Sequence, residues 1–598
     1  MASKLMHAFD VAGEETVSSD KIEKISGLAG SSPVFGIDLG TTNSAISVVA
    51  HGDNSETIRL TDGKFTMPSC VMWKDGRFVV GQEAYQHRAQ TNVIYSVKRF
   101  MQDPDKKVEL VDNGKQLEMT PAEVSAEILK GLVALTGGVY GEVKDVVVTV
   151  PAYFDQNGRN ATRKACELAG LNLIDIINEP TAAALCYDLD TSASGQETDF
   201  ITFDFGGGTF DVTLARITDN SKDTEVMDIY GLDGSSEGSG KIIQCLAIEG
   251  DSHLGGDDVD RDMLAVLDKK LKAEQGVSVN EFSREFRETM ILRLENLKKK
   301  GTDGVYSITI DDDALDGKHI SCSIMITQKD FKEALLPSYK RCRRILDSLV
   351  NKTPNSARKV ILVGGSTKNP ILVDLLKSDY PGYEFSDAVS QDLAVTQGAA
   401  IKGKIDKFGS DSVQVFDILP IAIGVHDVDR VMTIIPSGAT LPATKTHMFT
   451  TIEDNQSYMV LELLQGKSVV PEECVSLGKL RFDGIPSAPA GKPQLFVTIT
   501  INADSRMTCV GEVNGEKQTL KLDLTGETTQ HNSSGIGDSG LSERDKKLKK
   551  RWLRTAEKLP AEKKAVLLDL INGFPDFVSR TDINNYLRDN TEALKEVD

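Results

Sequence analysis

Three short glycine-rich segments carry the residue types in this chain that are best suited to chemistry. They read GIDLGTTNS at residues 36–44, FDFGGGTFD at residues 203–211 and ILVGGST at residues 361–367. Glycine lets backbone N–H groups approach phosphate oxygens without a Cβ in the way. Asp38 and Asp204 precede the glycines of the first two segments, where a carboxylate can hold hydrated Mg²⁺ against the phosphates. Two such loops predict a duplicated subdomain that holds one nucleotide between its halves.

The elements around these loops must position them. Strand-like and helix-like segments alternate from residue 34 to about residue 410, which predicts an α/β domain with layered sheets. Strands dominate residues 420–530 and predict an antiparallel β-sandwich. The short stretch at residues 411–419 is interpreted as the linker between these two regions. Residues 541–598 predict a helical tail, and residues 231–240 are rich in Gly and Ser, which is typical of an exposed loop.

Composition excludes several classes of function. The 598 residues carry a net charge of −21, which argues against a nucleic-acid partner because phosphate backbones need clustered Lys and Arg. The eight Cys residues contain no CxxC pair, so they indicate neither a disulfide framework nor a zinc site and favour a reducing compartment. No apolar run approaches the roughly 20 residues that a membrane helix needs. We therefore expect a cytoplasmic protein with no membrane partner.

Further sequence blocks give the chain a family resemblance. The blocks VPAYFDQNGR, INEPTAAAL, HLGGDD, DNQ, LQG and SLGKLRFDGIPSAPAG follow one another in a fixed order. Together with the three loops they resemble the heat shock protein 70 family, the DnaK-type chaperones. The resemblance implies an α/β actin-like ATPase domain with a duplicated ribonuclease H-like core, then a β-sandwich peptide-binding domain and a short α-helical lid. The implied boundaries are 1–33 for an acidic N-terminal extension of unknown role, 34–410 for the ATPase domain, 411–419 for the linker, 420–530 for the sandwich and 541–598 for the lid.

The resemblance also assigns residues around a bound nucleotide. Hydrolysis of ATP needs a metal on the phosphate oxygens, an acceptor that orients the attacking water and a cation that offsets developing charge. The matching catalytic positions are Asp38, Lys98, Glu179, Asp204, Thr209 and Asp211, with Asp38 and Asp204 reaching Mg²⁺ through water. The positions that match ATP and ADP contacts are Gly40, Thr41, Thr42, Asn43, Gly207, Gly208, Glu295, Lys298, Lys299, Thr302, Gly365, Ser366 and Lys368. K⁺ is a further candidate cofactor.

A second group of matching residues concerns coupling and polypeptide binding. Pro151, Arg159, Asp175, Asn178 and Asp417 match positions that couple the nucleotide to the sandwich and to a J-domain co-chaperone. Val425, Val428, Val431, Phe449, Ile452, Met459 and Leu461 match the peptide groove, although ordinary core packing explains such apolar residues equally well. The implied partners are extended hydrophobic polypeptides, a J-domain protein and a nucleotide exchange factor. The C-terminal sequence KEVD adds a TPR protein as a candidate partner.

Several residues depart from the family pattern. Lys299 and Lys368 stand where two arginines usually enclose the adenine, and lysine stacks poorly on a flat base, so we expect weaker adenine binding. Asp175 replaces an arginine that faces the J-domain, so we expect electrostatic repulsion and either a dedicated J-protein with compensating charge or no J-protein. Gln414 interrupts the apolar linker, and Met459 stands in place of a usual Val. These departures predict a specialised chaperone.

Two alternatives to a chaperone stay open at the level of sequence. A small-molecule kinase can share the actin-like scaffold, because a fold alone does not fix function. The predicted sandwich and helical tail argue against a kinase, which carries no such module. A regulatory or exchange-factor-like relative with weak ATPase activity is the second alternative. The retained catalytic positions argue against it, and the altered base-binding positions and Asp175 keep it open.

Overall fold

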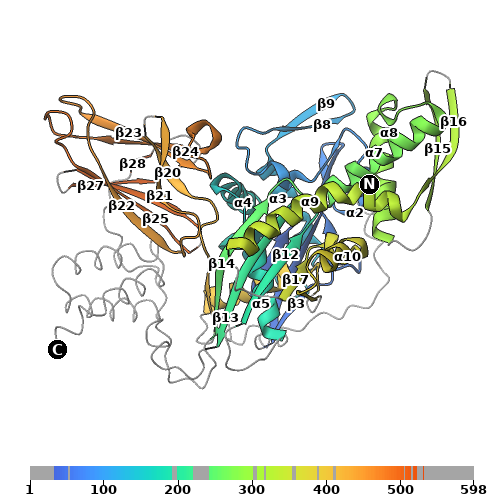
Figure 1. The fold of residues 1–598 in the computed structure, drawn as a ribbon, viewed down its shortest axis with the longest axis horizontal. Coiled ribbons are helices and arrows are strands. Elements are labelled where there is room, and N and C mark those ends of the chain that lie inside the picture. Colours follow the sequence, from blue (N-terminus) through green and yellow to red (C-terminus); the bar gives the residue numbers. More distant parts are fainter. Residues whose placement is uncertain are drawn as a thin grey trace, which may run out of the picture.

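The structure is a computed structural model in two adjoining regions. It describes residues 33–51, 54–190, 198–219, 241–300, 306–315, 318–352, 359–386, 390–408, 413–427, 429–503, 505–513, 516–521 and 529–530. The N-terminal extension up to residue 32, the loop at residues 231–240, Thr302, Val428 and the predicted lid with its KEVD end lie outside these ranges. Figure 1 shows an α/β region, residues 34–408, beside a β region, residues 418–530.

The first sheet of the α/β region is built around the first glycine loop. The strands β1 (Val34–Leu39) and β2 (Asn43–His51) form an antiparallel pair on either side of that loop. β3 (Asn54–Thr57) and β4 (Met67–Pro68) pair with β2, while β10 (Asp145–Val150) and β11 (Asn172–Asn178) continue in parallel beyond β1. β10 is almost entirely buried and ends directly before Pro151.

The second sheet repeats this topology around the second glycine loop. β12 (Thr198–Phe205) and β13 (Phe210–Asp219) form the antiparallel pair, and β14 (Lys241–Asp251) lies beyond β13. On the other side β17 (Lys359–Val363) and β18 (Glu384–Ser386) continue in parallel. Each sheet thus has antiparallel strands on one side of its loop-bearing strand and two parallel strands on the other, as a duplicated unit requires.

Two helices pack between the sheets. They are α5 (Glu179–Asp190) and α11 (Ala394–Phe408), and their small residues share one core with strands of both sheets. A Cβ on Gly398 would lie 1.8 Å from the carbonyl oxygen of Ala182, so only glycine allows this close approach of the two helices. The helices α3 (Pro121–Ala134) and α4 (Gln156–Leu168) cover the other face of the first sheet, and α9 (Gln328–Lys352) and α10 (Pro370–Asp379) cover the second.

Each sheet also carries an outer lobe, and the two lobes are in contact through Arg88 and Glu295. The lobe of the second sheet consists of α7 (Gly256–Gln275), η2 (Val279–Glu281), α8 (Arg284–Lys300), β15 (Tyr306–Leu315) and β16 (Lys318–Ile326). The lobe of the first sheet consists of β5 (Cys70–Lys74), β6 (Arg77–Val80), α2 (Gln82–Gln86), β7 (Val93–Tyr95), η1 (Val97–Phe100), β8 (Val108–Asp112) and β9 (Lys115–Met119).

The β region consists of two antiparallel sheets that enclose a common apolar core. One sheet contains β20 (Ile423–Asp427), β21 (Arg430–Ile435), β23 (Tyr458–Gln465) and β24 (Val475–Asp483). The other contains β22 (Ala443–Phe449), β25 (Leu495–Ile501), β26 (Met507–Val513), β27 (Glu516–Lys521) and β28 (Thr529–Gln530). Buried and more exposed side chains alternate along β25, which is typical of a half-buried strand.

The two regions are in direct contact. Residues of the predicted linker form β19 (Val413–Phe416), which joins the edge of the second sheet in parallel with β14. The backbone N–H of Gln156, at the start of α4, donates to Oε1 of Gln465 in the β region at 2.9 Å. In Figure 1, α4 and β14 lie on the side of the α/β region that faces the β region. We call this arrangement the docked state.

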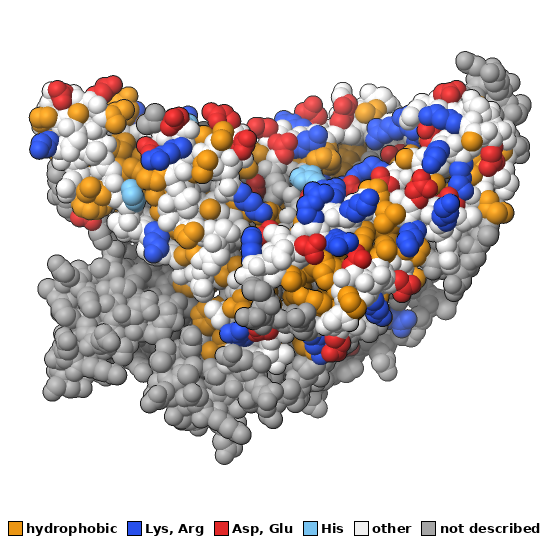
Figure 2. All heavy atoms as spheres, in the orientation of Figure 1, with side chains coloured by type: hydrophobic (Ala, Val, Ile, Leu, Met, Phe, Trp, Pro, Cys, Tyr) orange, Lys and Arg blue, Asp and Glu red, His pale blue; other side chains and the backbone are white. Residues whose placement is uncertain are grey.

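The surface mixes both signs of charge. Figure 2 shows acidic and basic side chains interspersed over the described part of this face, with apolar side chains between them. Within the described ranges, none of the helices has the length and apolar character that crossing a membrane would need.

Candidate functional site

The glycine loops of the two sheets touch one another. A Cβ on Gly207 would lie only 1.8 Å from Oγ1 of Thr42, and a Cβ on Gly208 would lie 2.5 Å from Cγ2 of Thr41. Glycine is therefore required where the second loop crosses the first. Oγ1 of Thr42 is buried and has no hydrogen-bond partner among the described residues. An orphaned hydroxyl between two glycine loops is the kind of donor that a phosphate oxygen satisfies.

Four carboxylates lie beneath these loops. Burial and then the nearby Glu179 raise the pKa of Asp38 to about 7, although Thr149 donates a hydrogen bond of 2.9 Å to it. Burial and then Glu179 also raise the pKa of Asp211 to about 8 and that of Asp204 well above its usual value. The sequence assigned these residues to the catalytic group, and the structure brings them into one cleft.

Lys98 is the cation of this cleft. It lies on η1, is buried, and forms an ion pair with Glu179. Thr209, in the second glycine loop, is buried as well. Since like charges in a low-dielectric site repel strongly, four carboxylates facing Lys98 favour binding of a further cation. Among the residues described, no three His, Cys, Asp or Glu side chains converge closely enough to ligate a metal ion.

A path of hydrogen bonds leads from the carboxylates to the linker. Oδ2 of Asp211 accepts a hydrogen bond of 3.2 Å from the backbone N–H of Ala152. Arg159, which is buried, contacts the carbonyl oxygen of Ala152 at 3.5 Å and donates to Oδ1 of Asn178 at 2.6 Å. Asn178 in turn donates to Oδ2 of Asp417 at 2.6 Å. Each step joins a different element, so the path runs from β13 through α4 and β11 to the residue after β19.

Four of the residues expected to couple the nucleotide to the β region lie on or beside this path. Pro151 directly precedes Ala152, and Arg159, Asn178 and Asp417 are members of the path itself. Thr181 adds a hydrogen bond of 3.1 Å to Asp417 and was not singled out from the sequence, although it lies within the INEPTAAAL block. Burial lowers the pKa of Arg159 to about 10, so its guanidinium stays charged at neutral pH.

Comparison with known proteins identifies the family. A family model described as "Hsp70 protein" matches residues 34–565. The chain belongs to the Hsp70 family. It is 32% identical over 531 residues to the protein named "Chaperone protein dnaK" of Cyanidioschyzon merolae (strain NIES-3377 / 10D), and the alignment covers 83% of this chain and 82% of that relative. Hsp70 proteins are, as a class, ATP-dependent chaperones with an actin-like ATPase domain, and the mixed sheets and helices described above are consistent with that fold.

The lysines that were expected to bind the base form internal ion pairs. On α8, Nζ of Lys299 lies 2.5 Å from Oε1 of Glu295, and Nζ of Lys298 lies 2.7 Å from Asp260. Lys368, in η3 (Gly365–Lys368), pairs with Asp392. Each lysine that was expected to contact adenosine therefore has a carboxylate partner.

Two further positions that were expected to contact the nucleotide, Gly365 and Ser366, lie in η3. Oγ of Ser366 donates to the carbonyl oxygen of Gly206 at 2.8 Å, which ties η3 to the second glycine loop. A Cβ on Gly365 would lie 3.2 Å from Oδ1 of Asp392. Thr302 lies outside the described residues, and α8 ends at Lys300. Ser366 thus lies beside the second glycine loop, and the contact of Gly365 and Ser366 with a nucleotide stays a prediction.

A cluster that the sequence did not reveal bridges the outer lobes. The guanidinium of Arg88 lies 5.1 Å and 5.2 Å from the ring centres of Tyr85 and Tyr95, and its Nη1 atom lies 2.6 Å from Glu295. The hydroxyls of Tyr85 and Tyr95 donate to Glu295 at 2.8 Å and to Glu288 at 2.6 Å. We call these five residues the clasp. No short motif marks it, because its members come together only through tertiary contacts.

Asp175 does not present a free charge. Its carboxylate accepts a bond of 2.6 Å from Nζ of Lys402, which also lies 2.6 Å from Asp406 on α11. The expected repulsion of an acidic J-domain motif assumed that Asp175 stands alone. Because Lys402 is shared between Asp175 and Asp406, it offsets part of that charge, so the repulsion should be somewhat weaker than the sequence suggests.

The residues matched to the peptide groove are divided among three settings. Val425, Met459 and Leu461 are buried in the core between the two sheets, and Phe449 packs partly against that core. Ile452 is 84% exposed, and Val431 faces a cavity between the two regions. Val428 lies outside the described residues. The burial of Val425, Met459 and Leu461 favours core packing over contact with a peptide. Ile452 is exposed, and its contact with a peptide remains a prediction.

Proposed function

We propose that this Hsp70 hydrolyses ATP in the cleft between its two sheets and that the state of the nucleotide controls the binding of extended hydrophobic polypeptides by the β region. The observation that carries the proposal is the hydrogen-bond path from Asp211 through Arg159 to Asp417. A polypeptide site that responds to nucleotide needs a physical connection to the γ-phosphate site, and this path supplies one. The path ends at Asp417 of the linker, and the four residues before Asp417 form β19.

The cleft suits a nucleotide phosphate chain with Mg²⁺. The four carboxylates repel one another, which a bound cation would relieve, and the hydroxyl of Thr42 lacks a partner that a phosphate oxygen would provide. We assign Asp38 and Asp204 to hold Mg²⁺ through water, and the loops at Gly40 and Gly207 to hold the phosphates. When bound, Mg²⁺ neutralises charge on the phosphate oxygens.

The protein's own groups act on the attacking water and on the developing charge. Oδ1 of Asp211 is buried and has no hydrogen-bond partner among the described residues, so we assign it to accept a hydrogen bond from that water. Glu179 is already paired with Lys98, and that ion pair fixes both side chains. Lys98 would offset the charge that develops on the γ-phosphate, and the hydroxyl of Thr209 would donate to it.

The coupling then follows from the docked state. Because β19 pairs with β14 of the same sheet that carries Asp204 and Asp211, closing of the cleft on ATP would favour docking of the linker. Loss of the γ-phosphate would weaken this preference and release the β region to hold its client. We further propose that a J-domain protein and an exchange factor act on this cycle, and that the departures at Asp175, Lys299 and Lys368 reflect a specialised client or co-chaperone.

The test is release of a fluorescent hydrophobic peptide from the full chain. We expect Mg²⁺·ATP to accelerate peptide dissociation and Mg²⁺·ADP to leave it slow. Thr209→Ala should retain binding of ATP and slow its hydrolysis in a single turnover. Thr213→Ala, on the same strand pair but farther along β13, is the matched control. Peptide dissociation that is identical with ATP, ADP and no nucleotide would refute the proposal.

One observation favours a second candidate function. Lys299 and Lys368 are both held by carboxylates, which leaves the base side without a stacking cation and is compatible with weak nucleotide turnover. A regulatory or exchange-factor-like relative would then act on another Hsp70. Acceleration of ADP release from a partner chaperone, with no peptide binding of its own, would favour that function over the first.

A further inference from the structure

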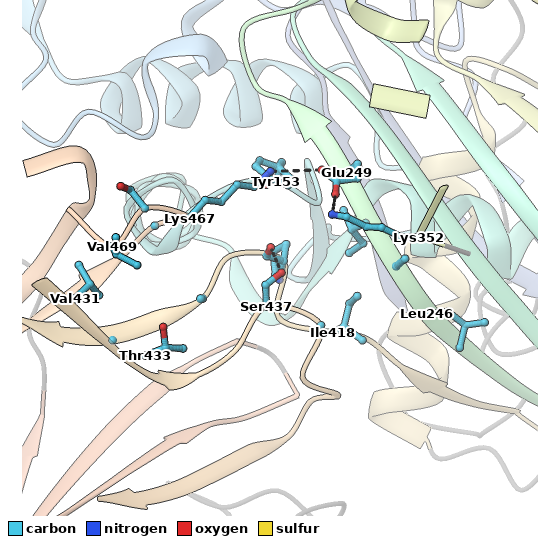
Figure 3. A pocket seen from close by; sticks show the side chains of 18 residues that line it. Tyr153, Leu246, Glu249, Lys352, Ile418, Val431, Thr433, Ser437, Lys467 and Val469 are labelled. Atoms are coloured by element: carbon cyan, nitrogen blue, oxygen red, sulfur yellow. Dashed lines mark hydrogen bonds and ion pairs between the residues drawn. The ribbon is translucent and has the colours of Figure 1, made fainter. Parts of the chain in front are cut away.

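A cavity of about 390 Å³ lies between the two regions of the docked protein (Figure 3). Its walls come from both regions and from the connection between them. The α/β region contributes residues of β14 with Tyr153 and Lys352, the connection contributes Ile418 and Pro420, and the β region contributes the loop at residues 466–469 with parts of β20 and β21. This volume falls within the range of roughly 300–1,000 Å³ that is typical of small-molecule sites.

The polar side of the cavity carries more positive than negative charge. Oε1 of Glu249 pairs with Lys352, and Oε2 of Glu249 lies 3.4 Å from Nζ of Lys467. One buried carboxylate therefore serves two ammonium groups. Figure 3 shows both lysines directed toward Glu249 from opposite sides. Burial lowers the pKa of Lys467, as expected for an ammonium that its surroundings do not fully compensate.

Tyr153 adds an unused hydrogen-bond donor to the same wall. Nζ of Lys467 lies 4.5 Å from the centre of the Tyr153 ring, so the two side chains are adjacent. The hydroxyl of Tyr153 is buried and has no hydrogen-bond partner among the described residues. Leaving a buried hydroxyl unpaired costs about 1–3 kcal/mol, so a ligand that accepts a hydrogen bond there would be favoured.

The rest of the lining is apolar. Leu246 and Ile248 of β14, Ile418 of the connection, and Val431 and Val469 of the β region all face the cavity. An apolar body would fit against these side chains while an anionic group reached Lys467 and Tyr153. An inorganic anion would leave the apolar walls without a partner.

We propose that this cavity is a binding site for a small organic carboxylate with an apolar body. Its carboxylate pairs with Lys467 and accepts a hydrogen bond from the Tyr153 hydroxyl, and its apolar part packs against Ile248, Ile418 and Val431. Because the walls belong to both regions, the complete site exists only in the docked state. Binding therefore stabilises docking to the same extent that docking strengthens binding. The site does not depend on ATP hydrolysis.

The experiment measures binding of phenylacetate to the full chain by ligand-observed saturation-transfer NMR, with phenylacetamide as the neutral analogue of the same shape. We expect phenylacetate to bind and phenylacetamide to bind about tenfold more weakly, because the amide lacks the charge that Lys467 compensates. Lys467→Met removes the ammonium group, keeps most of the apolar side chain, and should weaken phenylacetate binding by a similar factor. Lys445→Met removes an exposed lysine of β22 that does not line the cavity, so it should bind like the wild type.

Two further variants separate this site from binding elsewhere. Tyr153→Phe removes only the hydroxyl and should weaken binding by a few-fold. Asp417→Ala breaks the hydrogen bonds that hold the linker, without altering any residue of the cavity wall, and should abolish binding by separating the walls. Equal binding of phenylacetate and phenylacetamide, undiminished binding by Lys467→Met, or full binding by Asp417→Ala would each overturn the proposal.

Discussion

The phosphate end and the base end of the cleft are built on different principles. At the phosphate end, buried carboxylates repel one another, and the hydroxyl of Thr42 has no partner among the described residues. At the base end, Lys298, Lys299 and Lys368 are each neutralised by a carboxylate. The first arrangement gains stability when a cation binds, and the second is already satisfied without a ligand. Nucleotide affinity in this Hsp70 should therefore depend mainly on the phosphates and the cation, with a smaller contribution from the base.

The largest effect should come from the phosphate end. We expect Asp204→Asn to reduce single-turnover ATP hydrolysis by about 10²–10³-fold, because it removes a carboxylate that we assign to the magnesium ion. The rate of γ-phosphate release from a preformed complex with ATP measures this effect.

A matched control lies on the same strand. Asp199→Asn, near the start of β12, breaks only an ion pair with Arg216 near the surface and should leave hydrolysis within a few-fold of wild type. If both variants hydrolysed ATP equally well, the contrast between the two ends of the cleft would lose its basis.

The clasp should give an intermediate effect. Arg88→Met removes the buried ion pair with Glu295, and breaking such a pair from one side costs about 3–5 kcal/mol. Only part of this free energy favours the closed arrangement of the lobes over the open one. We therefore expect ADP to dissociate about tenfold faster. Stopped-flow displacement of a fluorescent ADP measures the rate. Arg77→Met, an exposed arginine of β6, serves as the control. An unchanged rate would show that the clasp does not hold the lobes together.

The clasp should also be insensitive to pH near neutrality. Burial alone would raise the pKa of Glu295, but the adjacent Arg88 and Lys299 lower it to about 2. An acid with a depressed pKa contributes its stability above the unfolded-state pKa and loses it only as the pH falls toward the folded-state value. Wild-type ADP release should therefore change little between about pH 6 and pH 8 through this group. A steep acceleration toward pH 6 that disappears in Glu295→Gln would contradict this.

The smallest effect should come from the base itself. Lys299→Arg supplies a planar guanidinium next to Glu295, so we expect ADP to bind about threefold more tightly by isothermal titration. Lys269→Arg, on the exposed face of α7, should have no effect. A tenfold or larger gain would mean that the base end limits affinity, which reverses the comparison.

The sequence predicts which residues meet at the glycine loops for a physical reason. Glycines lie two residues from Asp38 and from Asp204, and a glycine lets the backbone approach another chain segment closely, so the spacing predicts contact between the two loops. The duplicated sheet order follows from the same segments, because each loop lies between two strand-like runs. For these residues, their positions in the sequence were enough to predict that they meet.

The base end and the connection between regions could not be predicted in the same way. Arg88 and Tyr95 belong to no motif, and their contacts with α8 depend on how two outer lobes face each other. Asp175 illustrates the same limit, because only the folded chain brings Lys402 beside it. Two charged residues that lie far apart in the sequence show no pattern of spacing. The sequence therefore does not reveal that they form an ion pair.

The central claim is that the nucleotide controls docking of the linker through Arg159. Hydrogen–deuterium exchange at the backbone amides of residues 413–416 tests it most directly, with Mg²⁺·ATP before hydrolysis compared with Mg²⁺·ADP. The account predicts exchange about tenfold slower with ATP than with ADP in the wild type, and the same exchange with both nucleotides in Arg159→Met. Equal exchange with both nucleotides in the wild type, or an undiminished difference in Arg159→Met, would contradict it.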